Sequence, residues 1–208
     1  MRRAPTASTL VRMITLYHAT KSRSSRFLFL LEELGAPYTV KPVSIRRGDG
    51  SGKADPENPH PHGKVPAIKD DGVLVYESSA IALYLTDKFP QADLGPAIGD
   101  PKRGPYLSWL AYYTGVLEPA FVSKFLKAEV PRGTAGWVVV EEAVQHVESA
   151  LSKSPYLLGD RFSAADILYG TAFAMFAGSP LMPKSEAVAD YSTRVVARPA
   201  YARGLAKD

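Results

Sequence analysis

The composition of this chain indicates a globular protein and excludes several kinds of chemistry. Its 208 residues, of which 46% are hydrophobic, suffice for one large domain or two small ones, and the absence of cysteine excludes disulfides, thiolate metal sites and a thiol nucleophile. The formal net charge of +4 comes from 25 Lys and Arg against 21 Asp and Glu mixed along the chain, so nucleic-acid binding is not expected.

The first twelve residues are basic, polar and without periodicity. They predict a disordered extension over residues 1–12, with Met13 as an alternative start. No apolar run is long enough to span a bilayer, and the N-terminus lacks the continuous apolar stretch of a secretory signal. We therefore expect a cytoplasmic protein with no membrane partner.

Residues 13–90 are predicted to form a first domain that mixes strands and helices. Residues 13–17 have the pattern of a buried strand, and residues 24–34 carry apolar side chains at helical spacing. A second strand is expected over residues 38–43, and a loop rich in Gly, Pro and His follows over residues 48–63.

A hairpin and a helix then offer two ways to hold a small peptide. Val65 precedes Pro66, which favours an extended backbone and, in a tight turn, a cis bond, so the backbone of Val65 can pair with an extended ligand. Glu77 and Ser78 stand where a strand gives way to a helix, whose N-terminus favours a carboxylate. Glu77 adds an acceptor for an ammonium group, and Ser78 can cap the helix or donate to the carboxylate. The resulting order, βαβ and then ββα, is that of the thioredoxin fold.

The second half of the chain is predicted to be all helical. Residues 91–105 are rich in Pro and Gly and suit a linker, and residues 106–208 show no alternating strand pattern. Apolar residues recur at helical spacing over four segments, 106–117, 120–130, 137–151 and 164–176. Ser163 and Asp166 have the spacing of a capping box, whose role is structural and whose loss would cost about 1 kcal/mol.

The segments 63–68 and 77–78 resemble the glutathione-binding signature of the glutathione transferase superfamily, and the resemblance covers nearly everything after Met13. It implies a thioredoxin-like glutathione-binding domain followed by an all-α domain that contributes a hydrophobic substrate pocket. The implied activity is stabilisation of the glutathione thiolate and its conjugation to a hydrophobic electrophile. Glutathione would be a co-substrate, with no cofactor and no metal, and the protein would be a homodimer.

The resemblance also implies site residues. A hydroxyl donor to the sulfur is expected between the first strand and the first helix, where Ser22 is preferred, Ser24 is second, and Thr20 and Tyr17 stay open. The absence of cysteine implies a serine-type rather than a cysteine-type site. The residues expected to bind glutathione are Lys64, Val65, Pro66, Glu77 and Ser78, and those expected to face the hydrophobic substrate are Tyr112 and Tyr113.

Two other functions remain compatible with these residues. The same thiolate could reduce a hydroperoxide, because that reaction needs no protein cysteine. A protein that binds glutathione or hydrophobic ligands without catalysis would share the fold, although the retained Val65-Pro66 and Glu77-Ser78 pairs argue against a lost glutathione site.

Overall fold

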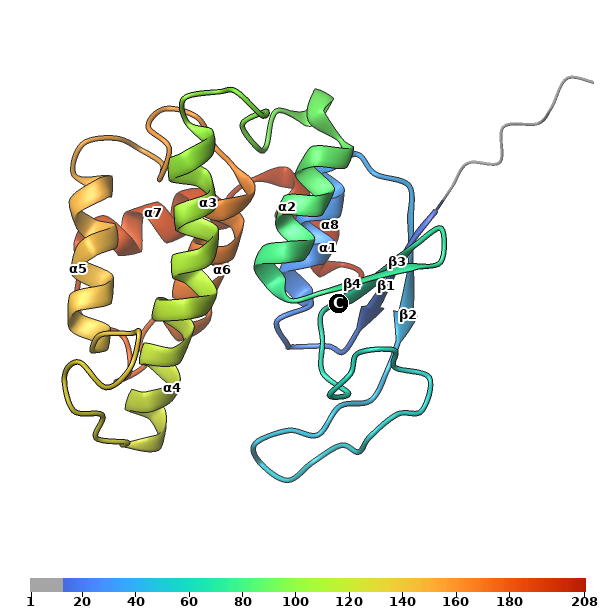
Figure 1. Cartoon of the computed structure of the whole chain (residues 1–208), viewed down its shortest axis with the longest axis horizontal. Coiled ribbons are helices and arrows are strands. Elements are labelled where there is room, and N and C mark those ends of the chain that lie inside the picture. The colour runs from blue at the N-terminus through green and yellow to red at the C-terminus, as the bar shows by residue number, and fades with distance from the viewer. Residues whose placement is uncertain (1–12) are drawn as a thin grey trace, which may run out of the picture.

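The computed structural model describes residues 13–208, which form a sheet with its covering helices followed by a helical part (Figure 1). The predicted extension over residues 1–12 lies outside the described residues. The first part contains, in chain order, β1 (Ile14–His18), α1 (Ser25–Leu34), β2 (Tyr38–Pro42), β3 (Ala67–Asp70), β4 (Val73–Tyr76) and α2 (Ser78–Lys88). The predicted order, βαβ and then ββα, is therefore confirmed.

The four strands form one mixed sheet in the order β2-β1-β3-β4. Strand β1 is parallel to β2 and antiparallel to β3, and β3 and β4 form a hairpin. The Val65-Pro66 bond that precedes β3 is cis, as predicted. Val65 packs against Ala19 and Val43, so the cis turn lies beside the loop that leaves β1.

The second part contains only helices. They are the 3-10 turn η1 (Pro90–Ala92), α3 (Arg103–Tyr112), the π turn η2 (Tyr113–Leu117), α4 (Glu118–Leu126), α5 (Val140–Leu151), α6 (Ala164–Phe176), α7 (Glu186–Val196) and α8 (Pro199–Leu205). The all-helical prediction is confirmed, and α6 begins and ends at the predicted residues. Within residues 13–208, no helix is long and apolar enough to cross a membrane.

The structure differs from the sequence prediction between residues 103 and 130. Two separate helices were predicted there, whereas α3, η2 and α4 follow one another without a break and end at Leu126. In the π turn the N–H of Glu118 bonds to the carbonyl of Tyr113, one residue further back than in an α-helix. The turn ends two residues before Pro119, which has no N–H to continue the α pattern.

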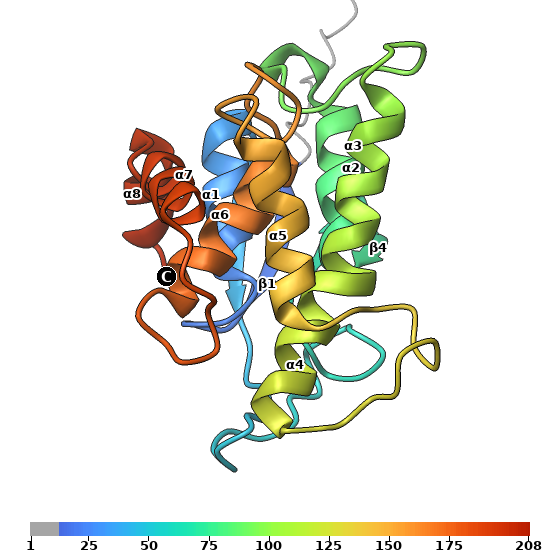
Figure 2. The ribbon, with the colours of Figure 1, turned by 90° about the vertical axis from the view of Figure 1, so that its left-hand side faces the viewer.

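Helix α1 is buried between the sheet and the later helices α6 and α8, as the two ribbon views show (Figures 1 and 2). The ring of Phe29 in α1 meets the edge of Tyr201 in α8, with centroids 5.5 Å apart. Gly204 permits this approach, because a Cβ atom there would lie 2.8 Å from the backbone nitrogen of Phe29. The last described helix therefore covers a helix of the first part.

The predicted capping box at the start of α6 is confirmed. The Asp166 carboxylate is fully buried and accepts from the N–H of Ser163 at 2.8 Å. It also accepts from the N–H of Leu157 at 2.9 Å and from the hydroxyl of Tyr191 at 3.0 Å. Asp166 therefore caps α6 and also ties α6 to the loop at Leu157 and to α7.

Candidate functional site

A cavity of about 710 Å³ lies between the sheet part and the helical part. Its walls come from the loop before α1, the cis turn and the start of α2 on one side, and from η2, α4 and α6 on the other. The predicted site residues that line it are Ser22, Lys64, Val65, Pro66, Glu77, Ser78 and Tyr113. Ser24 and Tyr112 are not part of its lining.

The cis turn presents unused backbone groups to this cavity. Neither the N–H nor the C=O of Val65 has a hydrogen-bond partner within the described chain. The preceding carbonyl, that of Lys64, is held by the side-chain amide of Asn58 at 3.0 Å. An extended peptide placed along the turn could pair with Val65 as a neighbouring strand would.

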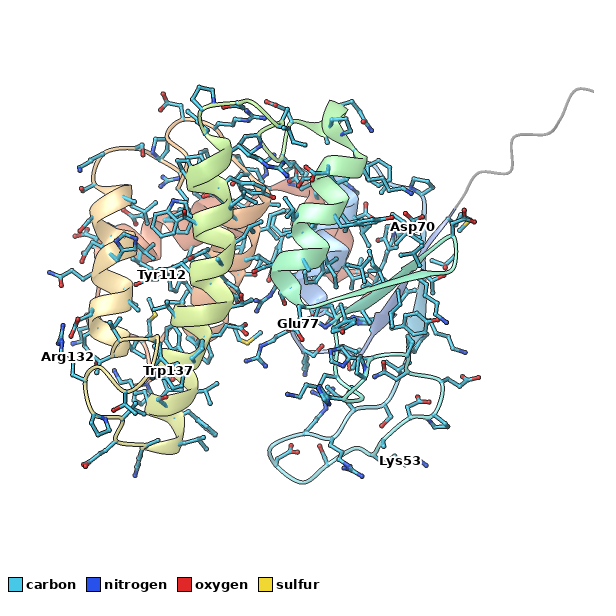
Figure 3. All side chains as sticks on the ribbon, in the orientation of Figure 1. Lys53, Asp70, Glu77, Tyr112, Arg132 and Trp137 are labelled. Carbon is cyan, nitrogen blue, oxygen red and sulfur yellow. The ribbon has the colours of Figure 1, made fainter. Side chains whose placement is uncertain are left out.

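Helix α2 begins at the cavity wall with an unusual backbone conformation. Its N-cap is Glu77 at φ 72°, a region in which residues other than glycine are uncommon and are stabilised by their surroundings. Ser78, the first helical residue, is buried, whereas 64% of the Glu77 side chain is exposed. Figure 3 labels Glu77 at the start of α2. The first amides of α2 and the Glu77 carboxylate therefore offer a donor cluster and an acceptor side by side.

The residues around this helix end are mainly cationic. The basic side chains of the lining are Lys21, Arg23, Arg26, Arg46, Arg47 and Lys64, and its acidic ones are Glu77 and Glu118. His60 is buried at the same wall, and its Nε2 lies 3.9 Å from Glu77 Oε1. Burial lowers the pKa of His60, with the Glu77 charge opposing the shift, so the ring is neutral at pH 7. The excess of cations suits a ligand with net negative charge.

Two of the predicted serines occupy different depths in the loop before α1. Ser22 is half-buried at the cavity, and its hydroxyl donates to the carbonyl of Ala19 at 2.6 Å. Ser24 is fully buried behind it, and the two hydroxyl oxygens are 2.8 Å apart. Ser22 is therefore the one of the pair whose hydroxyl can reach a ligand in the cavity.

The two other open alternatives lie away from the cavity lining. Thr20 is exposed, and its carbonyl accepts from Arg47 at 2.8 Å. Tyr17 is half-buried and packs against the small cluster that contains Val65, with Lys69 over its ring.

An ion-pair network joins α1 to the helical wall, and sequence reasoning missed it. Arg26 is 4% exposed and donates to the hydroxyl of Tyr113, which in turn donates to Glu118 at 2.7 Å. Arg23 donates to the same carboxylate at 2.9 Å. Burial raises the pKa of Tyr113, so its hydroxyl stays protonated. The signal in the sequence was a charged residue, Arg26, directly before the apolar run Phe27 to Leu31.

The helical wall of the cavity is largely apolar. Leu117, Phe121 and Phe125 line it at successive intervals of four residues, a spacing that could have indicated this face from the sequence. Tyr112 points elsewhere: its ring lies 4.9 Å from that of His146 in α5, and Figure 3 shows its label between α3 and α5.

Among residues 13–208, no group of three His, Cys, Asp or Glu side chains could hold a metal ion.

Comparisons with known proteins point to one family. A family model described as glutathione S-transferase, N-terminal domain, matches residues 22–88, and one described as glutathione S-transferase, C-terminal domain, matches residues 127–194. The Arabidopsis thaliana glutathione S-transferase PM239X14 is 32% identical over 161 residues, which are 70% of this chain and 73% of that protein.

Solved structures agree in fold over almost the whole chain. A glutathione transferase from Methylococcus capsulatus is 27% identical with a TM-score of 0.76, over 94% of this chain and 98% of that one. A sphingomonad glutathione S-transferase complexed with glutathione is also 27% identical, with a TM-score of 0.73, over 93% of this chain and 98% of that one.

Proposed function

This chain belongs to the glutathione S-transferase family, and we propose that the cavity between its two parts binds glutathione and a hydrophobic electrophile side by side. The enzyme is a glutathione S-transferase that uses glutathione as its co-substrate. The observation that carries the site assignment is that Ser22, the cis turn and the start of α2 line one cavity with an apolar opposite wall.

The polar wall suits glutathione in one orientation. Its γ-glutamyl carboxylate would lie on the first amides of α2 and on Ser78, and its ammonium group on Glu77. Its peptide backbone would pair with the free N–H and C=O of Val65 beside Pro66. Lys64 would bind the glycyl carboxylate. This direction leaves the cysteinyl sulfur near the loop before α1.

Ser22 is the proposed donor to the sulfur. A thiol of ordinary pKa is mostly protonated at neutral pH, and a hydroxyl aimed at the sulfur stabilises the thiolate without a permanent proton transfer to the serine. Lys21 and Arg23 flank Ser22 at the cavity, and their charges would lower the thiol pKa further.

The electrophile would lie against the helical wall. The apolar side chains of η2, α4 and α6 there suit a hydrophobic body. The Tyr113 hydroxyl is held by Arg26 and Glu118, so Tyr113 contributes its ring to this wall. Of the two tyrosines predicted for this role, Tyr113 borders the cavity and Tyr112 packs between helices.

Ser22→Ala tests the assignment. The variant should lose about a hundredfold in turnover with an aromatic halide and keep its glutathione dissociation constant, because only the thiolate form loses a donor. Ser108→Ala is the matched control, since Ser108 is an exposed serine of α3 outside the cavity. Unchanged turnover in Ser22→Ala would direct attention to Ser24, Thr20 or Tyr17. Absence of both turnover and retention on a glutathione column in the natural sequence would contradict the whole assignment.

A homodimer is also proposed. The edge strand β4 exposes Val73 and Tyr76, whose exposed fractions are 56% and 41%. An edge strand with exposed apolar side chains is a surface that proteins usually cover. Sedimentation of the purified protein at several concentrations would test this, and a monomer at all of them would contradict it.

A further inference from the structure

From Ser22, a row of polar groups continues away from the cavity. Its members are Ser22, Ser24, His18 and Asp208. The Ser24 hydroxyl lies 2.8 Å from Ser22 Oγ and 2.8 Å from His18 Nδ1, and it also accepts from the N–H of Ala19 at 3.2 Å. Ser24 therefore connects the serine at the cavity to a histidine that the cavity does not touch.

The far side of the histidine faces a carboxylate. His18 is 4% exposed, and its Nε2 is buried with no hydrogen-bond partner within residues 13–208. Asp208 Oδ1 lies 3.4 Å from Nε2, and the same side chain accepts from the hydroxyl of Ser25 and from the N–H of Lys21 at 3.2 Å. A carboxylate in this place favours the tautomer with hydrogen on Nε2, which leaves Nδ1 as an acceptor for the Ser24 hydroxyl.

We propose that His18, oriented by Asp208, takes up the proton of the glutathione thiol through the hydroxyls of Ser24 and Ser22. The Ser22 hydroxyl first turns its hydrogen from the carbonyl of Ala19 to Ser24 Oγ, 2.8 Å away. The S–H bond then breaks as its proton passes to Ser22 Oγ, the original Ser22 proton passes to Ser24 Oγ, and the original Ser24 proton passes to His18 Nδ1. The sulfur becomes a thiolate and the ring becomes an imidazolium beside the Asp208 carboxylate. After the transfer each hydroxyl donates in the opposite direction: Ser24 donates toward Ser22, and Ser22 donates to the thiolate. This inference rests on the proposed role of Ser22.

The surroundings of His18 suit a base that is neutral before glutathione arrives. Burial lowers the pKa of His18, and the Asp208 carboxylate opposes the shift. The other charged side chains that line a second cavity of about 450 Å³ with His18 and Asp208 are Lys207 and Arg47. Water in this second cavity would accept the proton from His18 at the end of turnover.

His18, Ser24 and Asp208 are positioning residues, because they act on the sulfur only through Ser22. The test is the pKa of the bound glutathione thiol, measured from the ultraviolet absorbance of the thiolate as a function of pH, together with the pH profile of kcat/KM. His18→Asn keeps a hydrogen-bonding group near Ser24 but cannot take up a proton, and Asp208→Asn removes the charge behind His18. His146→Asn is the control, since His146 stacks on Trp109 outside the cavity.

In His18→Asn the thiol pKa should rise by about one unit, and kcat/KM at neutral pH should fall about tenfold. The deficit should disappear above about pH 8.5, where the free thiol ionises without help. Asp208→Asn should shift both readouts in the same direction, and His146→Asn should shift neither.

Four outcomes would overturn the inference. A thiol pKa unchanged in both His18→Asn and Asp208→Asn is one, and a deficit that persists at high pH, as a purely structural role would give, is another. If Ser22→Ala shifts the thiol pKa and His18→Asn does not, the relay is wrong and the proposed function stands. If Ser22→Ala itself leaves the thiol pKa unchanged, the assignment of Ser22 fails and the relay fails with it.

Discussion

Replacing Asp166 by alanine should destabilise the protein far more than the loss of a helix cap. Its carboxylate accepts from two buried N–H groups, those of Leu157 and Ser163, and from the hydroxyl of Tyr191. A buried donor that loses its acceptor costs about 1–3 kcal/mol. Because water can enter part of the vacated space, we expect a loss of about 3–5 kcal/mol in the free energy of unfolding, against about 1 kcal/mol for a cap alone.

Urea unfolding followed by tryptophan fluorescence measures this loss, since Trp109 and Trp137 both lie in the helical part. For a chain of this size the melting temperature should fall by roughly 10 °C. Asp160→Ala removes an exposed carboxylate from the adjacent turn and should change stability by less than about 0.5 kcal/mol. A loss below about 1 kcal/mol in Asp166→Ala would refute the reasoning, because it would leave the cap as the whole contribution.

Three further changes test other parts of the structure. Glu77→Gln should raise the glutathione dissociation constant about tenfold in a calorimetric titration, because the charged acceptor for the ammonium group is lost. Gly204→Ala should cost about 1–3 kcal/mol in urea unfolding, because the added Cβ would meet the backbone of Phe29. Hydrogen bonds led by that from Lys207 lower the pKa of Glu32 to about 2, so its contribution to stability is present above the ordinary pKa of 4.5 and is lost as the pH falls toward 2. Glu32→Gln should therefore cost about 1 kcal/mol at pH 7, since its partners are half exposed, and nothing near pH 2, as unfolding at both pH values would measure.

Each of these three predictions has a matched control variant or a result that would contradict it. Glu129→Gln alters an exposed glutamate outside the cavity and should leave the glutathione dissociation constant unchanged. Gly104→Ala adds a Cβ in open space on α3 and should be neutral or slightly stabilising. Equal effects of the two glycine changes on the free energy of unfolding would argue against close packing at α8. If Glu32→Gln lowers the free energy of unfolding by the same amount at every pH, the ion pairs of Glu32 do not contribute as proposed.

Local patterns predicted much of this structure because local chemistry dictates it. The cis bond at Val65-Pro66 follows from a proline in a tight turn, and the capping box at Ser163 follows from residues three positions apart. The start of α2 beside Glu77 was likewise visible as a change from strand to helix periodicity.

The features that the sequence did not predict depend on contacts between residues far apart in the chain or on the π turn, which changes the angular spacing of side chains along a helix. Arg26 meets Tyr113 across a separation of 87 residues, and no local pattern records that pairing. The π turn that begins at Tyr113 adds a residue to one helical turn, which rotates every later side chain by about 100° relative to a regular helix. Tyr112 and Tyr113 stand before this rotation, and adjacent side chains of a helix point about 100° apart, so the two tyrosines do not share one face.

The contact of α8 with α1 also bears on how the protein folds. Arg198 pairs with Glu33, and Lys207 with Glu32, across separations of 165 and 175 residues. Contacts this distant close late and slow the folding reaction, so one face of α1 would stay uncovered until the helical part has formed. A fragment that ends after α2 would expose that apolar face, and we expect it to aggregate rather than to serve as a separate glutathione-binding module. The boundary between the two parts in sequence is therefore not a boundary at which the protein can be divided.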